Sequence, residues 1–251
     1  MASDYDWGLP TPPHHLLRDS ALFLDFDGTI VSLAERPDAI QVDDALKTLL
    51  KNLLTTLSGR VAVISGRAAD EIAFYIGSSD LIIAGSHGLE IAWPDGRSWK
   101  LARPATLDGV LSELQDLPQL FPGVLVEYKP FGIAIHYRQA PEAQEECRRR
   151  AIDLSQRANL RLQPGKMVFE LKAHGADKGS ALDRIMSAPP MLGYTPLFLG
   201  DDDTDEAGFS AAARMGGAGI LVGPPRRTAA AYALPDVEAA ISWLKTADHT
   251  Q

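Results

Sequence analysis

A short acidic motif directly after an apolar segment constrains this chain more than any other feature. Residues 21–24 are continuously apolar, which is typical of a parallel strand covered on both faces. The sequence DFDGT follows at residues 25–29, and its glycine allows the backbone to turn sharply. In open α/β sheets, ligands bind at the carboxyl ends of the strands. We therefore expect Asp25 and Asp27 to lie at a ligand site, although a solvated acidic turn would also explain the pair.

Apolar segments of the same kind recur toward both ends of the chain. They occupy residues 61–64, 81–84, 196–200 and 219–223, and leucines at helical spacing predict a helix within residues 42–57. Strands that alternate with helices favour a Rossmann-like, doubly wound parallel sheet, so we expect an α/β fold.

The middle of the chain has a different pattern, in which polar and apolar residues alternate. A helix, two strands, a second helix and two more strands are predicted in that order. Alternation indicates an antiparallel sheet with one face toward solvent or a ligand. We expect an inserted αββαββ cap domain at residues 104–174, a catalytic core formed by residues 16–103 and 175–251, and a flexible tail at residues 1–15.

Composition argues against several classes of protein. The formal net charge is −9, so the chain lacks the basic surface of a nucleic-acid binder. It contains no apolar signal segment and no window of about 20 apolar residues, so we expect a cytoplasmic protein without a membrane partner. A single cysteine, Cys147, rules out an internal disulfide and fits a reducing compartment. Nothing in the composition indicates the oligomeric state.

Polar residues follow several predicted strands and begin one predicted helix. Ser65 ends the second apolar segment, Asp201 and Asp202 follow a later one, and Lys178 begins a helix. Two pairs of acidic residues, a hydroxyl and a lysine together indicate phosphoryl transfer to a carboxylate. A carboxylate suits this role because it can attack phosphorus without first losing a proton. Mg²⁺ and a lysine would offset the charge of the phosphate. Taken alone, the Ser65 turn is also compatible with an ordinary turn, Lys178 with a solvated lysine and the acidic cluster with a helix cap.

These residues carry a resemblance to a known group of enzymes. DFDGT, Ser65, Lys178 and GDD at residues 200–202 resemble the four motifs of the haloacid dehalogenase superfamily. Within it the chain is similar to the trehalose-6-phosphate phosphatases, through SGR at residues 65–67, HG at 87–88, EYK at 127–129, Glu170 and GDDDTDE at 200–206. The resemblance covers nearly all residues from about 20 to 245.

The resemblance implies a role for each of the central residues. Asp25 would be the nucleophile and would form an aspartyl-phosphate. Asp27 would protonate the leaving sugar oxygen and then accept a proton from the attacking water, as general acid and general base. Ser65 and Lys178 would hold the phosphate.

The resemblance also implies Mg²⁺ as the cofactor. Asp25, the backbone carbonyl of Asp27 and Asp201 would bind the ion, with Asp202 and Asp205 in supporting positions. Oxygen ligands of this kind are the ones that Mg²⁺ prefers.

Charged residues of the middle segment share one face of the predicted sheet. They lie two positions apart, as Glu127 and Lys129, His136 and Arg138, and Glu170 and Lys172. The opposite face would be apolar and available for the helices of the insert to cover; it comprises Val124, Val126, Tyr128, Ile133, Ile135, Tyr137, Phe169 and Leu171. The charged face is either a solvated surface or a platform that binds sugar hydroxyls and closes over the phosphate.

By resemblance, the charged face would bind the sugar. Glu127, Lys129 and Glu170 would contact the distal glucose, with His136 as a further candidate. On the core side, we assign Gly66, Arg67 and His87 to substrate binding.

The expected activity is the hydrolysis of trehalose 6-phosphate to trehalose and phosphate, the last step of trehalose biosynthesis. A phosphatase of another sugar phosphate, such as sucrose phosphate, or a hexose phosphomutase would use the same chemistry. A signalling receiver also combines acids, a hydroxyl and a lysine, but it is about half as long, and its phospho-acceptor lies on a middle strand and not beside an adjacent DxD pair. A catalytically silent sugar-phosphate sensor is disfavoured, because every chemical residue is present.

Overall fold

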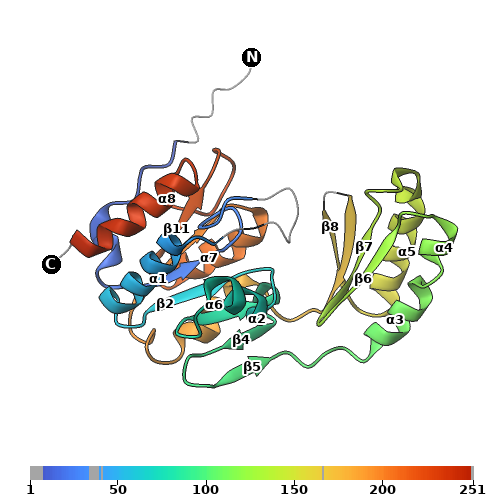
Figure 1. The fold of residues 1–251 in the computed structure, drawn as a ribbon, viewed down its shortest axis with the longest axis horizontal. Coiled ribbons are helices and arrows are strands. Elements are labelled where there is room, and N and C mark those ends of the chain that lie inside the picture. The colour runs from blue at the N-terminus through green and yellow to red at the C-terminus, as the bar shows by residue number, and fades with distance from the viewer. Residues whose placement is uncertain (1–7, 34–39, 41, 166, 250–251) are drawn as a thin grey trace, which may run out of the picture. The chain divides into compact units, whose positions relative to one another are not determined.

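The structure, a computed structural model, describes residues 8–33, 40, 42–165 and 167–249 of the chain (Figure 1). The chain divides into two units. The first consists of Met1–Lys100 and Ala176–Gln251, and the second of Leu101–Gly175. The insert expected from the sequence, residues 104–174, lies within the second unit, and each unit is described by itself below.

An eight-stranded sheet organises the first unit, with the order β12-β11-β10-β1-β2-β3-β4-β5. Its strands are β1 (Ser20–Leu24), β2 (Val61–Ile64), β3 (Ile82–Gly85), β4 (Glu90–Ala92), β5 (Ser98–Lys100), β10 (Thr195–Gly200), β11 (Ala218–Val222) and β12 (Tyr232–Leu234). The strands from β12 to β3 are parallel, and for β1, β2, β3, β10 and β11 this agrees with the prediction from the sequence. In contrast, β4 and β5 pair antiparallel. The sequence does not predict β4, β5 or β12, because segments of three residues are too short to show a periodic pattern.

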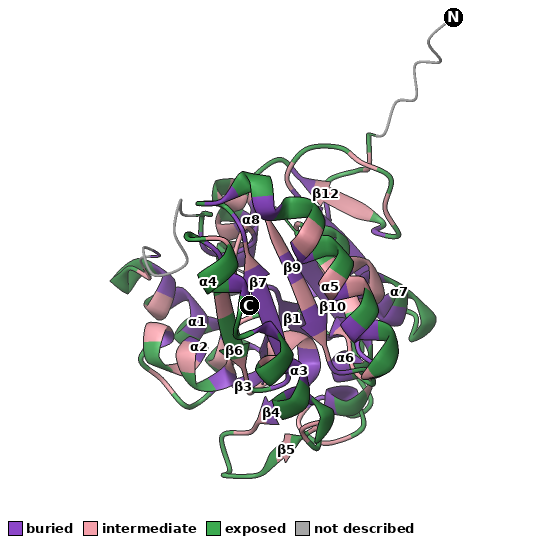
Figure 2. Cartoon of the chain, turned by 90° about the vertical axis from the view of Figure 1, so that its right-hand side faces the viewer, coloured by how far each residue is buried: buried purple, intermediate pink, exposed green. Residues whose placement is uncertain are grey.

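Helices cover both faces of this sheet, which confirms the doubly wound fold (Figure 1). One face packs against α1 (Asp44–Thr56), α2 (Ala69–Ile76) and α8 (Val237–Leu244), and the other against α6 (Lys178–Met186) and α7 (Glu206–Arg214). Leu22 and Leu24 of β1 belong to the first core cluster, and Ala21 and Phe23 belong to the second. Because both faces are covered, β1 is buried along its whole length and β10 is buried from Pro196 to Gly200 (Figure 2).

The pairing of β1 with its neighbours brings the polar residues that follow the strands together. Leu24 is aligned with Leu199 of β10 and with Val63 of β2, and all three strands run in the same direction. The Asp25 N–H donates to the Leu199 carbonyl at 2.9 Å, which extends the ladder by one residue. The residues after β1, β2 and β10 therefore emerge at one edge of the sheet.

The second unit contains a four-stranded antiparallel sheet in the order β6-β7-β9-β8. Its strands are β6 (Leu125–Lys129), β7 (Gly132–His136), β8 (Arg161–Gly165) and β9 (Val168–Lys172). The helices α3 (Thr106–Leu114), α4 (Leu117–Leu120) and α5 (Gln144–Arg157) lie on one face of the sheet and share a hydrophobic core with it (Figure 1). This is the expected αββαββ order with one short additional helix, α4.

Tyr128 differs from the expectation for the apolar face. The helices bury Ile133, Ile135 and Leu171 completely, but Tyr128 remains 49% exposed. It lies on β6, which is an edge strand of the sheet. The guanidinium of Arg103 lies 4.9 Å from the ring centroid, so a cation–π contact covers part of the Tyr128 ring.

The N-terminal segment contacts the C-terminal part of the first unit. Residues 1–7 of the expected tail lie outside the described part of the chain. Within the described part of this segment, the Pro10 carbonyl accepts a hydrogen bond from the Ala233 N–H at 3.1 Å, and the Pro12 carbonyl accepts one from Trp243 Nε1 at 2.9 Å. Among the helices that the structure describes, none has the length and the apolar character needed to cross a membrane.

A substitution at Phe209 of α7 tests the hydrophobic core between the sheet and the helices α6 and α7. Its ring is fully buried and contacts the Phe198 ring edge-on at a centroid distance of 5.8 Å. We expect Phe209→Ala to lower the free energy of unfolding by about 3–5 kcal/mol, because it leaves a cavity between the helix and the sheet. Urea unfolding would measure the loss. The control Met215→Ala removes a side chain that is 40% exposed and should change stability much less; equal losses would contradict this description of the core.

Candidate active site

Asp25 lies at the centre of the site, immediately after β1. Its side chain is 5% exposed, and each carboxylate oxygen has a partner. Lys178 Nζ donates to Oδ1 at 2.6 Å, and the Thr29 hydroxyl donates to Oδ2 at 3.1 Å. Burial raises the pKa of Asp25, although the Lys178 ammonium acts to lower it.

Lys178 connects the carboxylates that follow two different strands. It is the first residue of α6, whose start is fixed by a capping box between Asp177 and Ser180. Its ammonium donates to Asp25 Oδ1 and to Asp205 Oδ1, both at 2.6 Å. Burial alone would lower the pKa of Lys178, but these two carboxylates outweigh it and raise the pKa, so the ammonium is charged.

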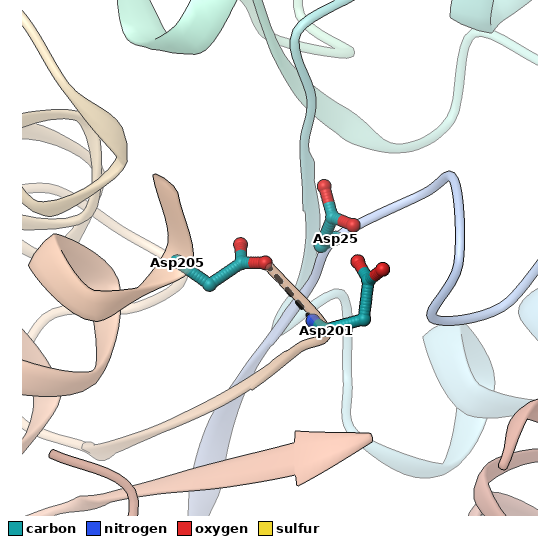
Figure 3. Close-up of side chains that lie close together, drawn as sticks. All are labelled: Asp25, Asp201 and Asp205. Atoms are coloured by element: carbon teal, nitrogen blue, oxygen red, sulfur yellow. Dashed lines mark hydrogen bonds between the residues drawn. The ribbon is translucent and has the colours of Figure 1, made fainter. Parts of the chain in front are cut away.

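Asp205 organises the acidic loop after β10. While its Oδ1 binds the lysine, its Oδ2 accepts hydrogen bonds from the N–H groups of Asp201 and Asp202, each at 3.0 Å. Figure 3 shows the bond from Asp201. Asp202 Oδ1 accepts from the Thr204 N–H at 2.8 Å and so caps the short 3₁₀ helix Asp203–Asp205. Both carboxylates therefore shape the loop, which explains the acidic string at residues 200–206.

The carboxylates of Asp25, Asp201 and Asp205 form the group of possible metal ligands, with one oxygen of each within 4.8 Å of the others (Figure 3). Burial and the Asp25 charge raise the pKa of Asp201 to about 7 and raise the pKa of Asp205 well above its usual value. Three carboxylates thus face a single ammonium, and the excess negative charge suits a divalent cation. The oxygens of Asp205 accept three hydrogen bonds and its side chain is fully buried, whereas each Asp25 oxygen accepts one and Asp201 is only partly buried, so Asp25 and Asp201 are the side chains best placed to bind it.

Ser65 lies at the end of β2 and is 1% exposed. Its hydroxyl accepts a hydrogen bond from the Arg67 N–H at 3.1 Å, which folds the Ser-Gly-Arg turn. Two backbone bonds tie this turn to the segment after β3: the His87 N–H donates to the Ser65 carbonyl at 2.8 Å, and the Ser86 N–H donates to the Arg67 carbonyl at 2.7 Å. The segments that follow β2 and β3 are therefore hydrogen-bonded to each other.

His87 packs directly against Gly66. A Cβ on Gly66 would lie 2.7 Å from His87 Cε1, so only a glycine leaves room for the imidazole. His87 and its neighbour Ser86 have φ values of 57° and 53°, and left-handed backbone at two successive residues other than glycine is costly. Such strain often accompanies functional sites.

Asp27 is held by an ion pair with Arg67. Arg67 Nε donates to Asp27 Oδ2 at 2.7 Å, and Arg67 Nη2 donates to Asp27 Oδ1 at 2.9 Å. The guanidinium also donates through Nη1 to Glu71 at 2.5 Å. The first unit thus brings together the core-side residues that the sequence motifs indicate.

The expected charged face of the second unit carries a network of ion pairs. Glu127 accepts from His136 Nε2 at 2.8 Å, and Lys129 Nζ donates to Glu170 at 2.5 Å. Glu170 also pairs with Lys172 at 2.6 Å. Burial alone would raise the pKa of Glu170, but Lys172 and Lys129 lower it to about 2, so the carboxylate is ionised.

Small residues of β7 separate the two rows of charged side chains. In the register of the sheet Ala134 is paired with both Glu127 of β6 and Glu170 of β9, so all three share a face. The Lys129–Glu170 bond consequently spans β7 above a methyl group. Arg138 follows β7 and is exposed.

Three contacts at the site go beyond what the sequence predicts. The Thr29 hydroxyl reaches Asp25, and it lies 3.4 Å from Asp201 Oδ1; its place in the DFDGT motif is the signal that could have indicated this contact. Glu90 is buried and accepts from the Ala69 N–H at 3.0 Å, which caps α2 from a neighbouring strand. Arg226 Nη2 donates to the Asp202 carbonyl at 2.7 Å from the segment after β11. Neither Glu90 nor Arg226 belongs to a recognisable motif.

Comparison with known proteins agrees with this arrangement. The family model for trehalose-phosphatase matches residues 23–238. The chain belongs to the trehalose-phosphatase family. It is thereby a phosphoric monoester hydrolase, and the family implies a divalent metal that the carboxylates of Asp25 and Asp201 fit.

Two curated relatives cover most of the chain. A probable trehalose-phosphate phosphatase of Sinorhizobium fredii is 39% identical over 222 residues, which span 87% of this chain and 84% of that protein. The trehalose-6-phosphate phosphatase of Escherichia coli is 35% identical over 227 residues, which span 90% of this chain and 85% of that protein.

Solved structures share the fold at lower identity. A trehalose-6-phosphate phosphatase related protein has a TM-score of 0.74 at 24% identity, covering 91% of this chain and 96% of that one. The C-terminal domain of Candida albicans trehalose-6-phosphate phosphatase has a TM-score of 0.77 at 20% identity, covering 96% and 98%. Both agree with the α/β fold expected from the sequence.

A substitution at Gly28 tests how closely the backbone packs against the Asp201 carboxylate. Its φ is +86°, and a Cβ there would lie 2.1 Å from Asp201 Oδ2. We expect Gly28→Ala to displace Asp201 and to weaken divalent-cation binding at least about tenfold, measured with Mn²⁺ by electron paramagnetic resonance. Gly216→Ala is the control, because Gly216 has a φ of +77° but no atom near its Cβ position. If both variants bind Mn²⁺ like wild type, the assigned position of the cation is wrong.

Proposed function

We propose that this chain hydrolyses trehalose 6-phosphate to trehalose and phosphate, with Mg²⁺ as cofactor and in the cytoplasm. The observation that carries the proposal is the buried Asp25 carboxylate beside Lys178 and Asp201, in a chain that the trehalose-phosphatase model matches over residues 23–238. The names of the relatives from S. fredii and E. coli support the substrate.

In the first half of the proposed reaction, Asp25 attacks the phosphorus atom. A bond forms between its carboxylate oxygen and phosphorus, and the bond from phosphorus to the sugar oxygen breaks. Asp27 donates a proton to that oxygen, so trehalose leaves as a neutral alcohol. The Lys178 contact supports this role, because it fixes the orientation of the Asp25 carboxylate.

In the second half, water hydrolyses the aspartyl-phosphate. The water oxygen attacks phosphorus and its proton passes to Asp27, while the bond from phosphorus to Asp25 breaks and restores the carboxylate. The proton received by Asp27 is the one that the next substrate requires.

The charge of the phosphate must be offset throughout both halves. Mg²⁺ bound by Asp25, Asp201 and the backbone carbonyl of Asp27 would supply this charge, with Asp202 and Asp205 in support. Lys178 contributes a further positive charge, and the Ser65 hydroxyl is available as a donor to a phosphate oxygen.

We assign recognition of the sugar to the charged face of the second unit. Glu127, Lys129, His136 and Glu170 offer donors and acceptors from three strands, as sugar hydroxyls require. Gly66, Arg67 and His87 are the corresponding candidates in the first unit.

The function is tested by phosphate release from trehalose 6-phosphate with and without Mg²⁺. We expect Mg²⁺-dependent release from wild type and a loss of at least about 10³-fold for Asp25→Asn, because the amide is not a nucleophile. Asp44→Asn is the matched control, since Asp44 is fully exposed on α1. Sucrose phosphate and glucose 6-phosphate complete the panel; equal or faster turnover of either would refute trehalose 6-phosphate as the substrate.

Glu170→Gln tests the assignment of the sugar. The amide can no longer form ion pairs with Lys129 and Lys172, so the charged face loses its arrangement. We expect KM for trehalose 6-phosphate to rise about tenfold or more, with little change for p-nitrophenyl phosphate, which has no sugar. Glu145→Gln on α5 is the control, because Glu145 is exposed on the helical layer. An equal effect on both substrates would place Glu170 outside sugar recognition.

A further inference from the structure

Arg67 forms ion pairs with two carboxylates, those of Asp27 and Glu71. Its guanidinium binds both oxygens of Asp27, through Nε at 2.7 Å and through Nη2 at 2.9 Å. The remaining Nη1 donates to Glu71 at 2.5 Å. Arg67 therefore lies between two carboxylates, one of them the group assigned to proton transfer.

The position of Arg67 is fixed at both ends of the residue. Its backbone N–H donates to the Ser65 hydroxyl, and its carbonyl accepts from the Ser86 N–H. Its side chain is 12% exposed, and its guanidinium lies 5.5 Å from the Tyr75 ring centroid. An arginine held in this way orients the carboxylate that it binds.

The contact suits one of the two tasks of Asp27. An N–H donor points at each oxygen, so the contact orients both oxygens of an ionised carboxylate. Asp27 is in this form when water attacks the aspartyl-phosphate, because it has by then given its proton to the leaving sugar oxygen. Each oxygen retains a further lone pair, which can accept a proton from that water.

We propose that Arg67 is a positioning residue for the second half of the reaction, in which it orients the Asp27 carboxylate toward the water that attacks the aspartyl-phosphate. This inference rests on the proposed function, since it assumes the phosphorylated Asp25. Water oxygen bonds to phosphorus, the bond from phosphorus to Asp25 breaks, and one water proton moves to Asp27. Glu71 then keeps the guanidinium paired while Asp27 is protonated.

p-Nitrophenyl phosphate separates the two halves of the reaction. Its leaving group departs as p-nitrophenolate without a proton from Asp27, so its colour reports formation of the aspartyl-phosphate. Steady-state turnover then depends on hydrolysis. For Arg67→Gln we expect a rapid burst of about one nitrophenolate per active site, followed by turnover about 10–100-fold slower than in wild type. Acid quenching and mass spectrometry should find phosphorylated Asp25 accumulating in the variant more than in wild type.

Two further variants show whether Arg67 acts through Asp27. Arg67→Lys keeps the charge but not the paired geometry, so we expect it to restore only a small part of the turnover. In an Asp27→Asn background, Arg67→Gln should have little additional effect. Arg150→Gln is the matched control, because Arg150 makes a similar bidentate contact with Asp116 in the second unit.

The outcomes distinguish this role from a structural one. If burst and steady-state rates fall by the same factor, or if phosphorylated Asp25 does not accumulate, the proposal is refuted. Additive effects of the Arg67 and Asp27 substitutions would refute it as well. Because the assay uses no sugar, failure of wild type to hydrolyse trehalose 6-phosphate would refute the proposed substrate without deciding the role of Arg67.

Discussion

The site depends on a buried ammonium between two buried carboxylates. Lys178 donates to Asp25 and to Asp205 at equal distances of 2.6 Å, and all three side chains are almost completely removed from solvent. A buried charge is tolerated only when partners replace the water that it loses. Removing Lys178 would leave both buried carboxylates without their ammonium. The arrangement therefore joins the ends of β1 and β10 to the start of α6.

Hydrogen bonds also hold the loops that follow the neighbouring strands. Asp205 uses its second oxygen to fold the loop that carries Asp201, and Arg226 holds the carbonyl of Asp202 from the other side. The Ser65 turn is bound to the segment of His87 by its backbone. The chemistry assigned to a few side chains thus requires the correct folding of loops from five strands.

Much of this fold could be predicted because its central strands are unusually clear in the sequence. β1, β2 and β10 are continuous apolar segments, and parallel pairing necessarily brings the residues after them, such as Asp25 and Ser65, to one edge. The ion pair of Asp27 with Arg67 could not be predicted, since 40 residues separate the two and the contact depends on the turn after β2. The exposure of Tyr128 also escaped prediction, because alternation does not reveal which strand forms an edge.

The ion pairs of the second sheet have a consequence for the approach of a substrate. Glu127 and Glu170 are balanced by Lys129 and Lys172, so these four side chains produce little electric field beyond their own contacts. These four side chains therefore do not steer an anionic molecule from a distance. They can recognise one after collision, by exchanging their internal ion pairs for hydrogen bonds to the ligand. Their own contribution to the encounter rate should be nearly independent of ionic strength.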